Sequence, residues 1–436
     1  MISLFDLSLQ LNGFPIKKAK AELDKIVNLS EEEYSLFLQN KKEEIVDFHL
    51  KNNSFYKELV GNKTNLKWED LPVLNKQNLQ KPLEERISKG YSRKNIYLNK
   101  TSGSSGTPFV FAKDKYSHAL TWASNIMRFG WFEIDFNHSY QARFYGIPMD
   151  FIGYHKERFK DFLSRRVRFP VFDLSDDVLE KFLKKFKTKK FDYINGYTSS
   201  IVLFAKYLEH KNIVLNEICP TLKACFVTSE MLFESDKKLL EKQFGIPIIS
   251  EYGASELDLI AFENPQGEWQ VNTETLFVEI LDENNNTVPH GTEGKIVITS
   301  LFNKANPFIR YEIGDIGILD ENSTPQKPIL KKLIGRTNDI AILPSGKKSP
   351  GLTFYYVTKS IIEDDGNVKE FIIKQIQLDT FEIEYISDFK LDSIQIQKIE
   401  KAISLYLEPN LNFSFIRKSV LERSNRGKLK QFKSYI

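Results

Sequence analysis

The chain has 436 residues, of which 41% are hydrophobic and 27% are charged, and its formal net charge is only +3. This length favours two or more domains, and the composition is that of an ordinary globular protein. A charge so near zero argues against nucleic acid as the main partner, because such partners usually require a strong basic excess. The sequence shows no stretch of about 18 apolar residues and no basic segment followed by an apolar run, so we expect a cytoplasmic protein without a membrane span.

The first hundred residues are predicted to be mainly helical, and strands, loops and helices then alternate. Short strands are expected at 95–98 and 109–112, followed by a helix at 116–127. Buried strands are expected at 222–227 and 246–250, with a helix between them that begins at a capping Ser235 and ends near Phe244. Strands that alternate with helices indicate an α/β architecture, in which ligands usually lie beyond the C-terminal ends of the strands.

From residue 269 to residue 320 the pattern becomes β-rich, with strands expected at 276–281 and 295–299 around an Asn/Pro/Gly-rich turn. A smaller unit is then predicted, with a hairpin at 371–376 and 381–385, a helical stripe at 396–407 and a third strand at 413–416. We therefore expect a large multi-layer α/β domain at 1–337 with a β-rich subdomain. A small α+β domain is expected at 338–436.

The two cysteines, Cys219 and Cys225, match no zinc-binding spacing and are expected to be reduced core residues. The six histidines include no pair with metal-ligand spacing on one helix. The densest basic run, 181–190, is interpreted as the far end of an amphipathic helix that begins after Ser175, rather than as a phosphate or membrane patch.

The strongest local signal for chemistry is a loop of small and hydroxyl residues that reads Thr101-Ser102-Gly103-Ser104-Ser105-Gly106-Thr107-Pro108. Glycines let the backbone approach an anion closely, and backbone N–H groups and hydroxyls can then surround phosphate oxygens. The Gly-Lys-Ser/Thr ending of a Walker A loop is absent. Taken alone, the segment is equally compatible with a flexible surface loop.

Three further segments follow this loop in order: Thr228-Ser229-Glu230, Glu251-Tyr252-Gly253-Ala254-Ser255-Glu256 and Arg310-Tyr311-Glu312-Ile313-Gly314-Asp315. With this order of motifs, the sequence resembles the adenylate-forming superfamily, which includes acyl-CoA synthetases and non-ribosomal peptide adenylation domains. The best match is the phenylacetate–CoA ligase-like branch, which includes the CapK-type proteins associated with capsular polysaccharide clusters. The resemblance extends from about residue 70 to the C-terminus.

The resemblance implies a role for each segment. The residues of the first loop would contact the β- and γ-phosphates of ATP; they are Thr101, Ser102, Gly103, Ser104, Ser105, Gly106 and Thr107. Relatives often have a lysine just after the proline, where this chain has Phe109. Ser229 and Glu230 would line the adenine site, at a place where relatives often have glycine.

In the next segment, Tyr252 would stack on adenine beside Gly253, and Ser255 would approach the α-phosphate. Glu256 would hold Mg²⁺. The residue types suit these roles, because tyrosine offers a rigid π-face and a carboxylate beside polyphosphate is useful only with a metal. Without the wider pattern, a core aromatic and a helix N-terminal carboxylate would be the simpler readings.

The remaining motifs lie toward the C-terminus. Asp315 would bind both ribose hydroxyls, although Ile313 replaces the usual threonine of the motif and an aspartate after glycine is also common in turns. Arg336 would contact ribose or phosphate, and Asn338 would be the hinge into the small domain. Lys428 would reach the substrate carboxylate and the α-phosphate, where a cation offsets developing charge. The choice of Lys428 over Lys430 depends on the resemblance, and the alternative is an ordinary basic tail.

The sequence thus predicts an enzyme that uses ATP and Mg²⁺ to convert a small-molecule carboxylic acid into an acyl-AMP. Its catalytic residues would be Lys428, Ser255 and Glu256. The small domain is expected to rotate between the two half-reactions. CoA is the expected acyl acceptor, while an amine, a sugar or a carrier remains open, as does a degenerate nucleotide-binding protein. The segment with Tyr145 and His155, together with Asn195-Gly196-Tyr197, is the expected wall of the acyl pocket. The helical N-terminal segment could support a homodimer.

Overall fold

The computed structural model describes residues 4–61, 66–101, 109–145, 155, 158, 160–162, 164–171, 174–336, 340–346, 348–350, 368–406, 408–423 and 429–436. The chain divides into two compact units. The first combines Met1–Ile313 with Ile318–Lys331, and the second combines Gly314–Gly317 with Lys332–Ile436. The functional domain boundary expected between residues 337 and 338 stays a prediction.

Helices open the first unit: α1 (Leu4–Leu11), α2 (Ile16–Val27), α3 (Glu31–Asn52), α4 (Ser54–Val60), two short 3₁₀ turns at Trp68–Asp70 and Asn78–Gln80, and α5 (Leu83–Arg86). Helix α3 begins at a capping box, in which the Ser30 and Glu33 side chains each accept a hydrogen bond from the other's backbone N–H. Buried residues of α2, such as Leu23, pack in one cluster with Leu120 of a later helix. The mainly helical start predicted from the sequence is confirmed.

A β-hairpin and a long helix follow. Strand β1 (Ile96–Lys100) pairs antiparallel with β2 (Val110–Asp114), so both short strands expected there are present. Helix α6 (Lys115–Gly130) begins directly after β2, because the Asp114 carboxylate accepts the N–H groups of Tyr116 and Ser117 at 2.9 Å each.

The first unit is centred on a seven-stranded sheet with the order β4-β3-β5-β6-β7-β8-β9. Its strands are β3 (Gln141–Phe144), β4 (Arg166–Phe169), β5 (Tyr193–Tyr197), β6 (Ala224–Thr228), β7 (Ile248–Ala254), β8 (Asp258–Glu263) and β9 (Trp269–Val271). The strands from β4 to β7 are parallel, and β8 and β9 add to the sheet in antiparallel pairing. The predicted α/β class is confirmed.

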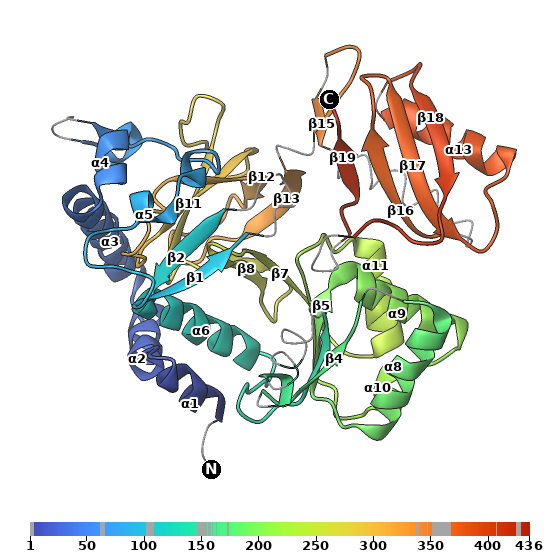
Figure 1. Cartoon of the computed structure of the whole chain (residues 1–436), viewed down its shortest axis with the longest axis horizontal. Coiled ribbons are helices and arrows are strands. Elements are labelled where there is room, and N and C mark those ends of the chain that lie inside the picture. Colours follow the sequence, from blue (N-terminus) through green and yellow to red (C-terminus); the bar gives the residue numbers. More distant parts are fainter. Residues whose placement is uncertain are drawn as a thin grey trace. The chain divides into compact units, whose positions relative to one another are not determined.

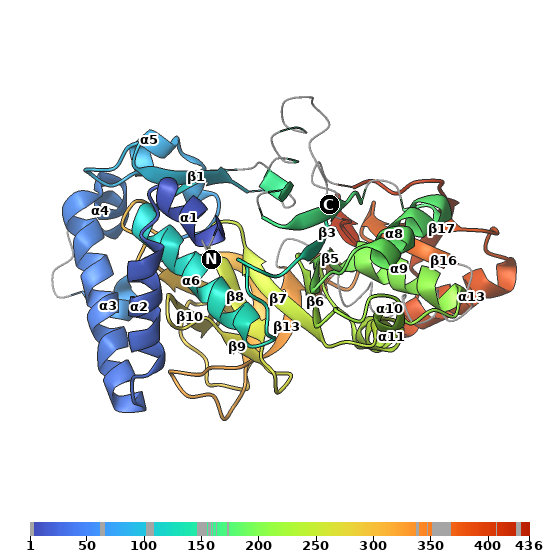
Figure 2. The same cartoon turned by 90° about the horizontal axis from the view of Figure 1, so that it is seen from below.

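Helices cover both faces of this sheet (Figures 1 and 2). One face packs against α8 (Asp176–Thr188), α9 (Thr198–His210), α10 (Leu215–Ile218) and α11 (Glu234–Phe244) in a core rich in phenylalanine. Phe129 of α6 packs on the opposite face, against Phe226 and Ile249. Cys219 and Cys225 are free and buried, as predicted. The sheet therefore lies between two helical layers. In such sheets, ligands bind beyond the C-terminal ends of the parallel strands.

A second sheet, of order β10-β11-β12-β13, carries the β-rich segment. Its strands are β10 (Leu276–Leu281), β11 (Gly294–Ser300), β12 (Tyr311–Leu319) and β13 (Leu330–Arg336). The first two pair antiparallel with Leu276 opposite Ser300, which confirms the two strands predicted at 276–281 and 295–299.

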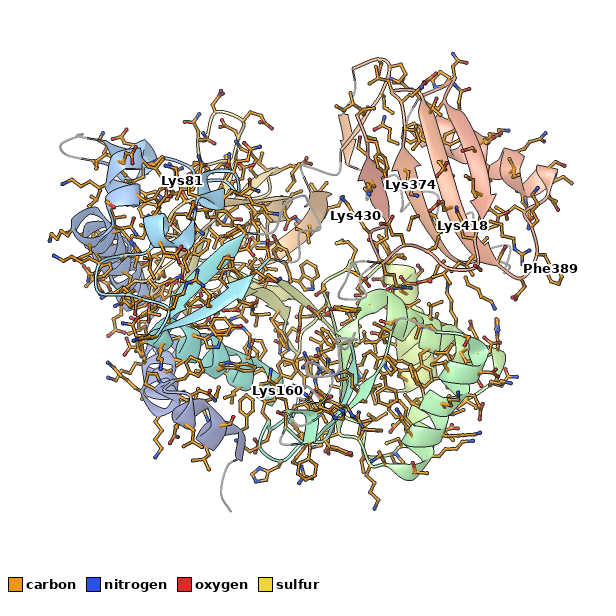
Figure 3. All side chains as sticks on the ribbon, viewed as in Figure 1. Lys81, Lys160, Lys374, Phe389, Lys418 and Lys430 are labelled. Carbon is orange, nitrogen blue, oxygen red and sulfur yellow. The ribbon has the colours of Figure 1, made fainter. Side chains whose placement is uncertain are left out.

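The second unit contains the short pair β14 (Ile340–Ile342) and β15 (Lys348–Pro350), and a four-stranded sheet of order β18-β17-β16-β19. Its elements are β16 (Val368–Gln375), β17 (Thr380–Ser387), α13 (Ser393–Tyr406), β18 (Asn412–Arg417) and β19 (Phe432–Ser434). The predicted hairpin, helix and third strand are all present. Lys374 and Lys418, labelled in Figure 3, both pair with Glu384, at 2.9 and 3.3 Å.

Two local predictions were wrong. The helix expected to begin at Ser235 begins one residue earlier, at Glu234, with Phe233 at the capping position and no side-chain cap. The strand expected to end at residue 250 continues to Ala254, because β8 pairs antiparallel with its second half. The first four residues of the Glu251–Glu256 motif therefore lie on a strand, and only Ser255 and Glu256 lie in the turn that follows it.

Candidate active site

Glu256 lies in the turn between β7 and β8 and is buried, with 8% of its surface exposed. Its Oε1 atom accepts a hydrogen bond of 3.0 Å from the hydroxyl of Tyr311, the first residue of β12. Tyr311 is itself buried and belongs to the next motif along the sequence. The structure thus brings together two residues that are 55 positions apart in the sequence and belong to different motifs.

A buried cation lies near the same carboxylate. Lys113 of β2 forms an ion pair with Asp258, the first residue of β8, and Asp258 also accepts a hydrogen bond of 2.7 Å from Thr121 of α6. Burial lowers the pKa of Lys113 to about 7, and the negative charge of Glu256 opposes that shift. No motif contains Lys113, although its spacing places it on the same strand face as Phe109 and Phe111, where a lysine signals a charge on a buried face.

The backbone around Glu256 is shaped by glycine. The ladder between β7 and β8 changes register between Tyr252 and Gly253. At that irregularity a Cβ atom on Gly253 would collide with the backbone carbonyl of Asp258, so only glycine fits. Tyr252 is buried, and its ring lies parallel to that of Trp269, with 6.3 Å between centroids. This arrangement holds Tyr252, Gly253, Ser255 and Glu256 at the end of β7.

The Thr228–Glu230 segment lies at the end of the neighbouring strand β6. Ser229 has a φ of 72°, in the left-handed region that favours glycine, which accounts physically for the glycine that relatives often have there. The Glu230 carboxylate accepts a hydrogen bond of 2.7 Å from the backbone N–H of Ser199, in the first turn of α9. Its side chain therefore caps a helix, and a role for Glu230 toward adenine stays a prediction.

Of the predicted phosphate loop, Thr101 is described and residues 102–108 are not. Ser102, Gly103, Ser104, Ser105, Gly106 and Thr107 thus lie outside the described residues. Thr101 closes the base of the loop. Its N–H donates to the carbonyl of Phe109, and its Oγ1 accepts from the N–H of Phe109, both at 3.0 Å. The two ends of the loop are therefore held together.

The C-terminal candidates belong to the second unit. Asp315 is buried on β12, directly after Gly314, whose φ of 88° requires glycine. Arg336 is the last residue of β13, and its side chain is not described. Lys428 lies outside the described residues, in a segment flanked by a β-bridge between Arg423 and Leu429. The roles of Asp315, Arg336 and Lys428 stay predictions.

The arginine of the Arg310–Asp315 motif is structural. Arg310 is almost fully buried, and its Nη1 donates to the backbone carbonyls of Glu69 and Leu71 at 3.0 Å each. Its Nη2 lies 3.5 Å from a carboxylate oxygen of Glu279. Arg310 thus ties the second sheet to the segment before the hairpin and places Tyr311 beside Glu256.

The residues expected to form the acyl-pocket wall lie at the ends of two neighbouring strands. Tyr145 directly follows β3, and Asn195, Gly196 and Tyr197 end β5. The rings of Tyr145 and Tyr197 are 4.5 Å apart. His155 is described, but most of its sequence neighbours are not. The assignment of these residues to an acyl pocket stays a prediction.

Among the described residues, no helix is both long and apolar enough to cross a lipid bilayer. The same part of the chain has no group of three or more His, Cys, Asp or Glu side chains suited to a metal ion. Mg²⁺, however, is commonly held by one or two carboxylates together with substrate phosphates. A single buried carboxylate such as Glu256, oriented by Tyr311, fits that kind of site.

No family model matches the sequence. The chain is 26% identical to protein CapK of Staphylococcus aureus over 405 residues. This alignment covers 87% of this chain and 84% of CapK. The chain is 24% identical to phenylacetate–coenzyme A ligase of Pseudomonas putida over 356 residues. That alignment covers 78% of this chain and 72% of the enzyme.

Among solved structures, 2-hydroxyisobutyryl-CoA ligase in the postadenylation state, in complex with 2-HIB-AMP, matches with a TM-score of 0.69 and 16% identity. The match covers 92% of this chain and 89% of that one. The amide bond synthetase McbA from Marinactinospora thermotolerans matches with a TM-score of 0.54 and 14% identity, over 79% and 69% of the two chains.

The chain therefore has the fold of the adenylate-forming enzymes, the class that its order of motifs predicted. Within that class, its similarity to CapK and to phenylacetate–coenzyme A ligase supports the branch that the same motifs indicated.

Proposed function

We propose that this protein is an ATP-dependent ligase that activates a carboxylic acid as an acyl-adenylate and passes the acyl group to an acceptor, with CoA as the expected acceptor. The observation that carries the proposal is the hydrogen bond between Tyr311 and Glu256. It joins two of the motifs on which the resemblance rests, at the C-terminal end of a sheet where ligands bind.

In the first half-reaction, an oxygen of the substrate carboxylate attacks the α-phosphorus of ATP. The bond between the α-phosphorus and the bridging oxygen breaks, and pyrophosphate leaves. The main obstacle is repulsion between a carboxylate and a polyphosphate, so positioning and positive charge supply most of the catalysis. In the proposal, the loop 101–107 holds the β- and γ-phosphates, and Ser255 and Lys428 bind near the α-phosphate.

Glu256 is the proposed ligand of Mg²⁺. The ion, when bound, would neutralise phosphate charge. The hydrogen bond from Tyr311 fixes one oxygen of the carboxylate and so limits the orientations that the side chain can adopt. Asp315 would bind the ribose hydroxyls, and Arg336 would contact ribose or phosphate. Tyr252, with Ser229 and Glu230, would form the adenine site.

In the second half-reaction, the acceptor attacks the acyl carbonyl and AMP leaves. We expect the small domain, entered at Asn338, to rotate between the steps, which would withdraw Lys428 and admit the acceptor. A thiol acceptor such as CoA gives a thioester. An amine, a sugar or a carrier would give an amide or ester through the same adenylate, and in a CapK-like protein such an acceptor would fit a role in surface-polysaccharide synthesis.

The test is carboxylate-dependent release of pyrophosphate from ATP and Mg²⁺, measured for aryl, fatty, amino and sugar acids with and without CoA. Release that depends on one class of acid, and turnover that depends on CoA, would support the proposal. Release without any effect of CoA would favour another acceptor. ATP binding without release for any acid would favour a degenerate nucleotide-binding protein.

A further inference from the structure

One face of the central sheet carries polar side chains at its C-terminal end. In the parallel ladder, Arg143 of β3 lies opposite Asn195 of β5, and Thr228 of β6 lies opposite Glu251 of β7. Asn195 is also in register with Phe226, two residues before Thr228 on the same strand. Since side chains alternate along a strand, all four polar residues project from one face. Figure 1 shows the strands and the helices α8 and α9 on their other face.

Arg143 differs from the other arginines of this part of the sheet. Arg166 and Arg168 on β4 are both bound by the buried carboxylate of Asp161, at 2.5 and 3.0 Å. The described residues provide no such ion pair for Arg143. Its guanidinium instead lies over the ring of Tyr145, 4.3 Å from the centroid. Within the described part of the chain, its buried Nε has no hydrogen-bond partner. A desolvated donor of this kind is costly unless a ligand satisfies it.

The neighbours of Arg143 are polar or amphipathic. Thr228 and Glu251 are cross-strand partners on this face, and Arg143 lies over the ring of Tyr145. Burial raises the pKa of Glu251 and of Tyr145, and the charge of Arg143 opposes both shifts, which agrees with their lying near one another. The Tyr145 ring contacts that of Tyr197. A plain alkyl or aryl group bound against this surface would leave the Arg143 donors without a partner. An oxygen acceptor on the bound molecule would satisfy them, and charge-assisted hydrogen bonds of arginine are among the stronger ones.

We propose that Arg143 binds a second oxygen-bearing group of the acid that is activated, so that the substrate is a short carboxylic acid with a further carboxylate or hydroxyl at its distal end. This inference rests on the proposed function. Arg143 would then determine substrate specificity, and the ring of Tyr145 would orient its guanidinium. A plain fatty or aryl acid would then be a poor substrate.

The experiment is acid-dependent exchange of pyrophosphate into ATP with three matched series of four to six carbons. Succinate, glutarate and adipate are compared with butanoate, pentanoate and hexanoate, and with the corresponding ω-hydroxy acids; phenylacetate is included as a plain aryl acid. We expect the best dicarboxylate or hydroxy acid to exceed its plain counterpart in kcat/KM by about tenfold or more, since a site built to pair a polar group discriminates strongly. The hydroxy-acid arm distinguishes an anionic from a neutral distal group.

Arg143→Met should abolish that preference, lowering kcat/KM for the polar acid by about tenfold or more while leaving the plain acid within a few-fold. Arg93→Met, which removes an exposed arginine paired with Glu84, is the matched control and should leave the preference intact. Thermal unfolding of both variants separates misfolding from altered specificity. Exchange that favours the plain acids, or a preference unchanged in Arg143→Met, would overturn this inference alone. Exchange with none of these acids, but with an amino or sugar acid that lacks a further carboxylate or hydroxyl at its distal end, would also overturn this inference alone. Exchange with no acid of any class would overturn the proposed function as well.

Discussion

The hydroxyl of Tyr311 donates a hydrogen bond of 3.0 Å to Oε1 of Glu256, although Tyr311 begins β12 of the second sheet and Glu256 lies in the turn between β7 and β8 of the seven-stranded sheet. Both side chains are buried, and Arg310 holds the start of β12 in place through the carbonyls of Glu69 and Leu71. The carboxylate proposed to bind Mg²⁺ is therefore oriented by a neighbour that does not itself need to touch the nucleotide.

Tyr311→Phe tests this orientation. The substitution removes one hydrogen bond to a carboxylate and should cost about 1.5 to 3 kcal/mol of stability. The freed carboxylate should also bind the metal less well, so the Mg²⁺ concentration for half-maximal pyrophosphate release should rise several-fold. Both quantities can be measured on the same preparation, by urea unfolding and by a Mg²⁺ titration at saturating ATP.

Tyr56→Phe is the matched control, because the Tyr56 hydroxyl is buried in the same unit and has no hydrogen-bond partner among the residues that the structure describes. Its removal should leave stability unchanged or slightly higher and should not alter the Mg²⁺ requirement. An unchanged Mg²⁺ requirement in Tyr311→Phe would show that the hydrogen bond does not orient a metal ligand.

Much of the fold could be predicted because its signals are local. The hydrophobic period of the sequence predicts helix α6, the hairpin of the second unit and helix α13. The Tyr311–Glu256 contact could not be predicted in this way, because it depends on how two distant strands come together. The extension of β7 through Ala254 was missed for the same reason, since it is stabilised by the ladder with β8 rather than by its own sequence.

The same distinction applies to the site. The motif order indicated Glu256 and its neighbours, but no motif contains Lys113 or Arg143. Lys113 matters because β2 carries it to Asp258, 145 residues away. Arg143 matters because the register of β3 with β5 sets it beside Asn195. Such residues are recognised only when the strands are assembled.

Glu251→Gln should make the protein more stable at neutral and alkaline pH. Burial raises the pKa of Glu251 from 4.5 to about 7, so folding favours its neutral form. The stability that this group contributes is fully present below about pH 4.5 and is lost as the pH rises through about 7. A neutral glutamine avoids that loss. The difference in unfolding free energy between variant and wild type should therefore grow from pH 4.5 to about 7 and then level off.

Urea unfolding at several pH values measures this difference. Glu217→Gln, which removes an exposed glutamate of helix α10, controls for the loss of one negative charge. A Glu251→Gln variant that is less stable than wild type at pH 8 would mean that Arg143 pairs with an ionised Glu251 and that burial is not the dominant effect.

His49 should make the protein sensitive to acid. Its ring is fully buried, with Nε2 3.0 Å from the carbonyl of Asn303 and Nδ1 3.2 Å from the hydroxyl of Ser88. Burial lowers its pKa to about 4. The unfolded chain binds a proton near pH 6.5 that the folded state does not, so stability falls as the pH drops from 6.5 toward 4.

Between pH 7 and pH 5, this one group should remove about 2 kcal/mol of stability. His49→Gln should show a correspondingly weaker loss over that range, whatever its stability at pH 7. His210→Gln, at an exposed position, is the control for removal of a histidine. Equal pH dependence in wild type and His49→Gln would show that the ring accepts a proton without cost in the folded state.

Lys428→Ala separates the two half-reactions. If Lys428 serves adenylation, its removal should reduce acyl-AMP formation severely, because a cation at the α-phosphate acts only in that step. Transfer from a supplied acyl-AMP to the acceptor should largely survive. Lys430, which is labelled in Figure 3, lies two residues further along the same basic tail. Lys430→Ala is therefore the matched control, and it should leave both steps intact. Equal loss of both steps in Lys428→Ala would assign the lysine to folding of the tail, and loss of adenylation in Lys430→Ala instead would move the catalytic role to that residue.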